Sequence, residues 1–114
     1  MVSVQVGSEW VEPSAEGAAT ALDASSVEDG RSTTDLAFAI DRTTEASGAY
    51  PVLLVSYLIG CVEYADADVA ALVKGFFTTA VSDEGQQAAA DSAGSAPISQ
   101  DLASQAQAVI DQIK

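Results

Sequence analysis

The sequence predicts a mixed α/β fold, and three patterns support this prediction. Val2, Val4 and Val6 alternate with polar residues, which is the period-two pattern of a half-buried strand. Residues 52–59 form the only continuous apolar run and are typical of a strand that is covered on both faces. Residues 69–80 then repeat apolar side chains at helical spacing. We therefore expect a mixed sheet with flanking helices.

The first 22 residues are predicted to hold one strand and one short helix. Trp10 and Val11 extend the expected strand beyond Gly7. The helix is expected over residues 15–22, because Ser14 is a good N-cap and the next turn contains an acid near the positive end of the helix dipole. Residues 23–49 are ambiguous. They contain an expected loop up to Thr34, a candidate strand at 36–40 and a polar turn region after it.

The apolar run at residues 52–59 is predicted to be the central strand. Pro51 is tolerated at the start of a strand, where its missing N–H is not needed. A buried helix is the alternative, but Pro51 and Gly60 limit it to fewer than three turns, so the strand is favoured. Cys61 follows the run and is expected to be a buried, inert thiol.

Three helices are predicted after the apolar run. Asp66 or Asp68 caps the first, whose Phe76 and Phe77 are expected to be among the most buried side chains. The second covers residues 83–92, between a cap at Ser82 and a glycine stop at position 94. The third begins at Ser99 or Asp101 and carries an apolar stripe that ends at Ile113.

The charge of the chain excludes several classes of partner. There are 17 acidic and 4 basic residues, giving a formal net charge of −13, and the acids are spread along the whole length. Nucleic acid is not expected as a partner, because phosphate backbones are bound by lysine and arginine. Anionic membrane surfaces are disfavoured for the same reason. The acidity is best explained as a contribution to solubility.

No catalytic, cofactor-binding or metal-binding residue is assigned from the sequence. Glu63, Asp66 and Asp68 could together bind a hard cation, but helix capping is the favoured role for acids at this position. Asp41 and Glu45 flank Arg42, which indicates a solvated ion pair. Tyrosines recur every seven residues at positions 50, 57 and 64 and are expected to mark core and rim rather than an aromatic box.

Enzymatic activity is not expected. The chain has no histidine and one cysteine, so Cys/His zinc sites and an internal disulfide are excluded. It has no Gly-x-Ser-x-Gly elbow, and a Ser–Lys arrangement would have to use Lys74 or Lys114. No glycine-rich phosphate loop and no signal peptide pattern occur in these 114 residues.

Three phrases resemble the phosphate-binding proteins of ABC phosphate importers, the PstS family. They are the apolar stretch Gly48–Cys61, the Pro-Ser-Ala-Glu-Gly-Ala-Ala phrase at 13–19 and the Val-Ser-Asp-Glu-Gly-Gln-Gln phrase at 81–87. The resemblance extends over most of the chain, from Val2 to Ile113. It implies the C-terminal segment of a two-lobed periplasmic-binding-protein fold of type II, in which residues 1–47 end the second lobe. Residues 48–114 would return to the first lobe as a hinge strand, near Gly48–Pro51, and three helices.

The resemblance also implies a function and a location. The parent would be an extracytoplasmic receptor, in the periplasm or lipid-anchored at the cell surface, that binds inorganic phosphate and delivers it to an ABC permease. The family's phosphate-binding motifs lie earlier in the chain and cannot be matched here, so these 114 residues alone are not expected to bind phosphate. Without the missing N-terminal part they are expected to self-associate. The alternative is a self-contained acidic domain with a protein-interaction or structural role.

Overall fold

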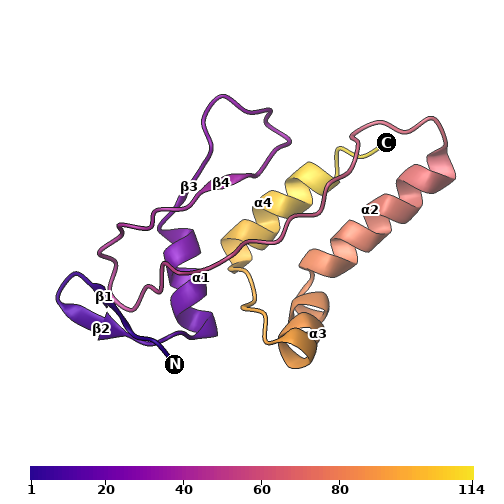
Figure 1. Ribbon diagram of the computed structural model, residues 1–114. Helices are drawn as coiled ribbons and strands as arrows, with labels where there is room; N and C mark the ends of the chain where they lie inside the picture. The colour runs from indigo at the N-terminus through magenta and orange to yellow at the C-terminus, as the bar shows by residue number, and fades with distance from the viewer.

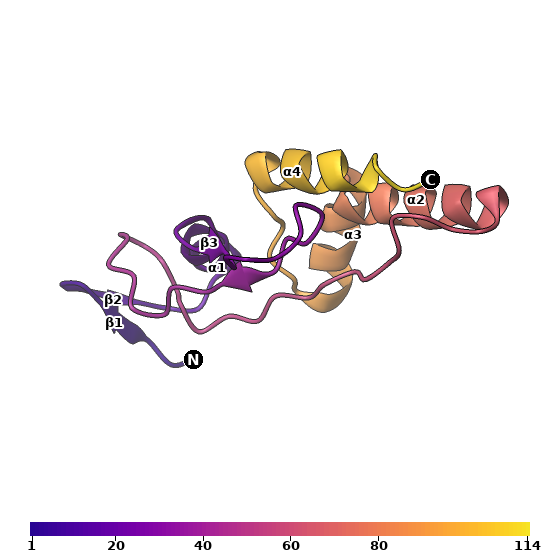
Figure 2. The same ribbon diagram turned by 90° about the horizontal axis from the view of Figure 1, so that it is seen from above.

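The computed structural model describes all 114 residues and places them in two groups of elements (Figure 1). The N-terminal group contains two small sheets and one helix, and the C-terminal group contains three helices. The two groups lie side by side along the long axis of the molecule in both views (Figure 2). The chain is elongated, with extents of 53 × 34 × 19 Å and a radius of gyration of 15.8 Å, whereas a compact domain of this length has a radius of about 13 Å.

The N-terminal strand pattern produces a hairpin rather than one extended strand. Strand β1 (Val4–Val6) pairs antiparallel with β2 (Glu9–Val11), and Val6 lies opposite Glu9. The prediction that Trp10 and Val11 extend the first strand is therefore wrong. The chain reverses at Gly7, whose φ of 55° suits the first central position of a two-residue hairpin turn.

Helix α1 (Ala15–Asp23) confirms the predicted helix and its cap, since the Ser14 hydroxyl accepts a hydrogen bond from the Gly17 N–H at 2.9 Å. Residues 48–51 lie against this helix, because the Gly17 carbonyl accepts a bond of 2.8 Å from the Tyr50 N–H. A Cβ on Gly17 would lie 3.0 Å from the Gly48 carbonyl oxygen. The small core of this group consists of Val6, Gly17, Ala21, Leu22, Ala49 and Pro51.

A second two-stranded sheet lies in the region that the sequence left ambiguous. Strand β3 (Ser26–Val27) pairs antiparallel with β4 (Phe38–Ala39). The candidate strand at 36–40 is confirmed over Phe38–Ala39. The expected loop up to Thr34 is wrong at β3, where Val27 pairs with Phe38, eleven positions later, and Ser26 with Ala39, thirteen positions later.

The central strand predicted at residues 52–59 is not formed. These residues belong to no helix or strand, and the two sheets of the molecule are separate. The segment is nevertheless extended, and it connects the two groups of elements (Figure 1). A strand requires hydrogen-bonding neighbours, and neither two-stranded sheet extends to this segment. The fold is thus a small mixed α/β domain with four helices and two antiparallel sheets, not one mixed sheet.

The C-terminal helices match their predicted positions closely. They are α2 (Ala67–Val81), α3 (Asp83–Ala93) and α4 (Gln100–Ile110), and α2 packs against both of the others. The Asp66 carboxylate caps α2 by accepting from the N–H of Asp68 and Val69. Ser99 caps α4, and α3 ends at Gly94 with a φ of 67°, in the left-handed conformation that glycine adopts without steric cost.

Ser82 joins α2 to α3 as the cap of both helices. Its N–H donates to the Thr78 and Thr79 carbonyls, and its hydroxyl donates to the Thr79 carbonyl at 2.7 Å. The same hydroxyl accepts from the Gly85 N–H at 3.1 Å. One side chain therefore closes the end of α2 and opens α3, which makes a sharp corner between them.

The predicted burial of the phenylalanines is wrong for Phe76 and only partly met by Phe77. Phe76 is 61% exposed, Phe77 is half-buried, and their rings meet edge to face at 6.1 Å. Only 8 of the 114 residues are buried, and the accessible surface is 7454 Å². A compact monomer of this mass exposes about 5,800 Å². The chain thus leaves about 1,600 Å² more surface uncovered than a compact monomer does.

Candidate functional site

The most distinctive surface of the molecule is the linking segment, which we define as residues 51–62. It contains no charged residue, although the chain has a net charge of −13. Exposure alternates along its first half: Val52, Leu54 and Ser56 are exposed, while Leu53 and Val55 are half-buried. This period-two exposure is that of a strand with one face against the molecule and one in solvent.

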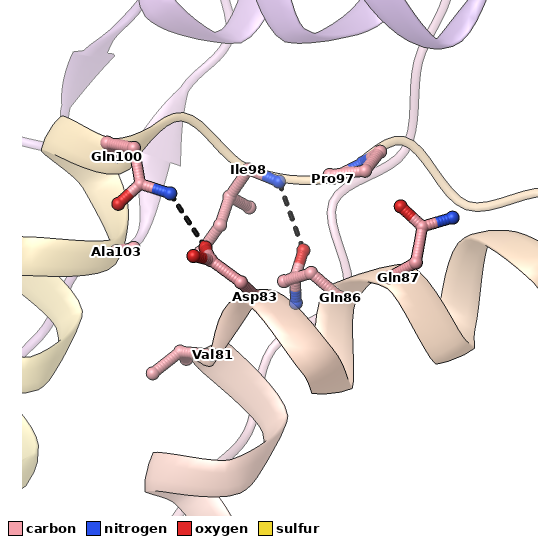
Figure 3. A pocket seen from close by; sticks show the side chains of 8 residues that line it. All are labelled: Val81, Asp83, Gln86, Gln87, Pro97, Ile98, Gln100 and Ala103. Atoms are coloured by element: carbon pink, nitrogen blue, oxygen red, sulfur yellow. Dashed lines mark hydrogen bonds between the residues drawn. The ribbon is translucent and has the colours of Figure 1, made fainter.

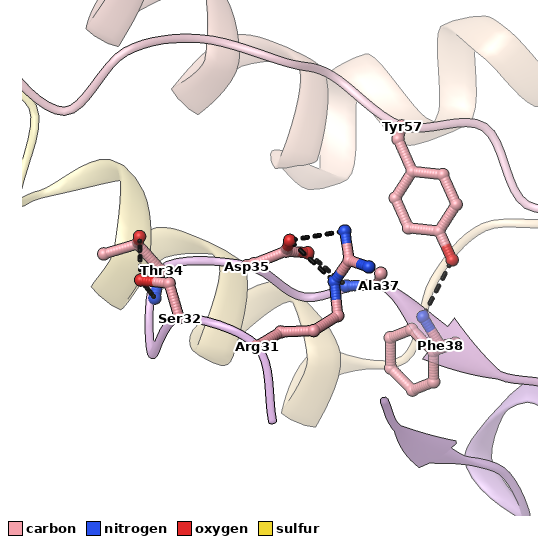
Figure 4. Close-up of polar contacts among 7 residues, drawn as sticks. All are labelled: Arg31, Ser32, Thr34, Asp35, Ala37, Phe38 and Tyr57. Carbon is pink, nitrogen blue, oxygen red and sulfur yellow. Dashed lines mark hydrogen bonds and ion pairs between the residues drawn. The ribbon is translucent and has the colours of Figure 1, made fainter. Parts of the chain in front are cut away.

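Side chains, rather than a backbone ladder, hold the linking segment in place. The Arg42 guanidinium donates through Nη1 to the Pro51 carbonyl at 2.8 Å and reaches the Leu53 carbonyl at 3.5 Å. The Tyr57 hydroxyl accepts from the Phe38 N–H of β4 at 2.9 Å (Figure 4). These contacts attach the first half of the segment to the N-terminal group.

The Arg42 contacts correct the predicted ion pair with Asp41 and Glu45. Arg42 forms no ion pair with either acid and binds backbone carbonyls instead. Asp41 is occupied locally, since its carboxylate accepts from the N–H and the hydroxyl of Thr43. The sequence carried no signal for the contacts of Arg42, because the carbonyls that it binds lie nine and eleven residues away.

An ion pair that was not foreseen lies in the loop between β3 and β4. Arg31 contacts Asp35 at 2.7 Å, and the second oxygen of that carboxylate accepts from the Ala37 N–H at 3.0 Å (Figure 4). The hydrogen bond from Ala37 is the main cause that lowers the pKa of Asp35, and the bond from Arg31 adds to it. The spacing of four residues between the two charges was the available signal, although the loop is not helical.

The pKa of Asp35 gives a testable pH dependence. The pKa of Asp35 is lower in the folded chain than in the unfolded one. The ionised carboxylate therefore contributes to stability above the ordinary aspartate pKa of about 3.9. This contribution is lost as the pH falls through the lower, folded-state pKa. In an NMR titration we expect the Asp35 carboxyl to titrate below the ordinary value, and Arg31→Gln to raise its pKa. An Asp35 that titrates normally in both proteins would contradict this geometry.

Of the three acids at Glu63, Asp66 and Asp68, only Asp66 caps a helix with its side chain. Asp66 accepts the Asp68 N–H at 2.8 Å, as described for α2, and the structure brings no three metal-ligating acid, cysteine or histidine side chains together. Nearby, the Val62 carbonyl accepts a bond from the Lys114 N–H, and the Tyr64 N–H donates to the Lys114 carbonyl, both at 2.9 Å. The end of the chain therefore holds the end of the linking segment.

Cys61 and the three tyrosines are placed differently from each other. The expectation that Cys61 is buried is wrong, because its side chain is exposed at the end of the linking segment.

The tyrosines form no aromatic box, and each hydroxyl makes one contact with the backbone. Tyr50 donates to the Val2 carbonyl at 3.0 Å, and Tyr64 accepts from the Cys61 N–H at 2.9 Å. Tyr50 thus attaches the chain before residues 52–60 to the N-terminal segment, Tyr57 attaches the segment itself to β4, and Tyr64 makes only a local contact.

Two shallow grooves lie beside the helices, and neither is lined by a lysine or arginine. The first, of about 240 Å³, lies at the corner of α3 and α4, where Gln86 accepts from the Ile98 N–H and Gln100 donates to Asp83 (Figure 3). The second, of about 370 Å³, is lined by residues from α1, α4 and the second sheet, among them Asp23 and Asp101. Carboxylates and amides in these positions offer an anion no charge complement.

Three of the four basic side chains are also occupied elsewhere. Arg31 and Arg42 have the partners described above, and Lys74 donates to the Asp111 carbonyl at 2.9 Å while its ammonium lies 3.6 Å from the Asp111 carboxylate. Neither Lys74 nor Lys114 donates a side-chain hydrogen bond to a serine hydroxyl. The arrangement therefore offers an uncharged, extended segment as its most distinctive site.

Comparison with known proteins identifies no relative. No family model, no curated protein and no solved structure matches the chain. No helix is both long enough and apolar enough to cross a bilayer.

Proposed function

We propose that this chain is part of an extracytoplasmic solute receptor that binds inorganic phosphate and delivers it to an ABC permease. The observation that carries the proposal is the linking segment, which lies within the stretch that most resembles the PstS family. It leaves the N-terminal group at the buried Pro51 and reaches the helical group at α2. A single extended crossing between two groups of elements is what a return segment between two lobes requires.

The local geometry supports a hinge on the C-terminal side of Pro51. Ala49 is fully buried, and the Tyr50 N–H donates to α1, so residues 48–51 would form the fixed side of the hinge. From Val52 to Gly60 the backbone N–H groups donate no hydrogen bond within the chain, so their dihedral angles can change without breaking a ladder. Lobe closure of this kind uses a few residues that absorb the whole rotation.

The phosphate donors of the receptor belong to segments that these 114 residues do not contain. This placement is supported by the grooves, which lack basic residues, and by the occupied arginines. Specificity would come from a dry cleft in which an anion with the wrong protonation state leaves a buried group unpaired. Within the receptor, residues 1–47 would end the second lobe and residues 48–114 would return to the first.

Calorimetry tests the assignment and the placement separately. The protein encoded by the longer reading frame should bind inorganic phosphate and should not bind sulfate, whereas the 114-residue chain should give no heat with either anion. Phosphate binding by the 114-residue chain would overturn the placement of the site. Absence of binding by the longer protein would overturn the family assignment and favour the alternative, an acidic domain with a protein-interaction role. The exposed, uncharged linking segment is the observation that supports this alternative.

A further inference from the structure

The linking segment has an unusual number of backbone donors without a partner in the chain. From Val52 to Gly60, no backbone N–H donates a hydrogen bond to any group of the protein. The flanking residues are bonded: the Tyr50 N–H donates to Gly17 and the Cys61 N–H to the Tyr64 hydroxyl. Among the carbonyls of the same residues, only that of Leu53 accepts a hydrogen bond, from Arg42. An extended segment whose donors and most acceptors are free is a template for pairing with another strand.

The side chains of the same segment leave apolar surface exposed. Leu54 is 96% exposed and Ile59 is 92% exposed, and Val52, Tyr57 and Leu58 are exposed as well. Apolar groups and unpaired backbone therefore coincide over the same residues. Pairing with a strand would satisfy the backbone and cover these side chains together.

We propose that residues 52–60 pair antiparallel with the same residues of a second copy of this chain, centred on Ser56. A two-fold symmetric antiparallel pair must be centred on one residue, because hydrogen-bonded and non-hydrogen-bonded pairs alternate along the ladder. Ser56 is the midpoint of the unbonded stretch. In this register Leu54 lies opposite Leu58, and Val55 lies opposite Tyr57, which is a favourable β-branched–aromatic pair.

Charge and area both favour a second copy as the occupant. Two chains of net charge −13 repel each other, and the longest stretch without a charge, residues 46–62, includes the linking segment. A cationic partner would instead be drawn to the acidic surface elsewhere. Each chain exposes about 1,600 Å² more than a compact monomer of its mass. If each copy covers half of this excess, the interface reaches the standard size of about 1,600 Å².

Sedimentation of the 114-residue chain over a dilution series tests the association. We expect a reversible dimer of twice the 11.6 kDa chain mass, and tighter association at high salt, which screens the repulsion between the acidic chains. Leu54→Asp should weaken the dimer by roughly tenfold or more, since it places a carboxylate against apolar side chains. Leu72→Asp makes the same substitution at a leucine of α2 that is 74% exposed and lies outside the segment, and it should have little effect.

Cysteine cross-linking tests the register in the Cys61→Ser background. Ser56→Cys should form an intermolecular disulfide readily, because the two positions face each other across the two-fold axis. Leu54→Cys should not, since its own copies would lie four residues apart along the ladder, or about 14 Å. A monomer at every concentration and salt, a dimer that tolerates Leu54→Asp, or equal cross-linking at both positions would each overturn the proposal. None of these outcomes depends on phosphate binding.

Discussion

Gly85→Ala is expected to destabilise the helical group by about 1–3 kcal/mol, as is typical of overpacking. A Cβ on Gly85 would overlap the Thr79 carbonyl oxygen and lie 3.3 Å from the Ala80 Cα. The obstacle is backbone rather than a flexible side chain, so the α2–α3 corner must open to admit the methyl group. The Ser82 hydroxyl, which bridges Thr79 and Gly85, would lose its position at the same time.

Gly75→Ala provides the matched control for this substitution. Gly75 lies inside α2, and an added Cβ would meet no atom within 4 Å other than the adjacent backbone of its own helix. Alanine should therefore stabilise the helix by about 0.5–1 kcal/mol, the usual difference between the two residues in a helix interior. Urea unfolding followed by circular dichroism should move the midpoint in opposite directions for the two variants. A neutral Gly85→Ala would show that the corner is more open than described.

Leu22→Ala is expected to have an even larger effect, a loss of about 2–4 kcal/mol. Leu22 is 7% exposed and is the largest aliphatic side chain among the few buried residues of the N-terminal group. Truncating a buried leucine removes its transfer free energy and leaves a cavity. Few other contacts hold α1 to the rest of this group, so we expect the loss to lower the unfolding midpoint and the N-terminal group to become more accessible to hydrogen exchange.

The control for Leu22→Ala is the same change at an exposed leucine. Leu72 lies on α2 with 74% of its surface exposed, so Leu72→Ala removes little buried area. Its midpoint should lie close to that of the unmodified protein, because alanine is also a good helix former. Equal losses at Leu22 and Leu72 would mean that the burial at α1 does not describe the protein in solution.

The helices and their ends could be predicted from the sequence because the interactions that define them are local. Ser14, Ser82 and Ser99 each accept from an N–H three residues later, and Asp66 accepts from the second and third residues after it. Gly94 ends α3 through its own dihedral angles. Such bonds depend on residue type and short spacing, which the sequence states directly.

The sequence assigned no site residues, and it predicted the linking segment as a central strand rather than as an exposed, unpaired stretch. The apolar run at residues 52–59 stood out in the sequence, yet whether it becomes a strand depends on a neighbour supplied from elsewhere. The contacts of Arg42 with the linking segment were not predictable from residues 41–45, and the exposed position of Cys61 was not indicated by its apolar neighbours.

What the sequence by itself determined is therefore the helices, their caps, the acidic character of the chain and the position of its uncharged apolar segment. Only the tertiary structure decided that Val4–Val11 turns back as a hairpin, that β3 pairs with β4, and that Phe76 and the linking segment remain exposed. The physical reason is range. A cap forms between groups a few residues apart, whereas strand pairing and side-chain burial depend on which distant segments meet, and the spacing of residues along the chain does not specify that.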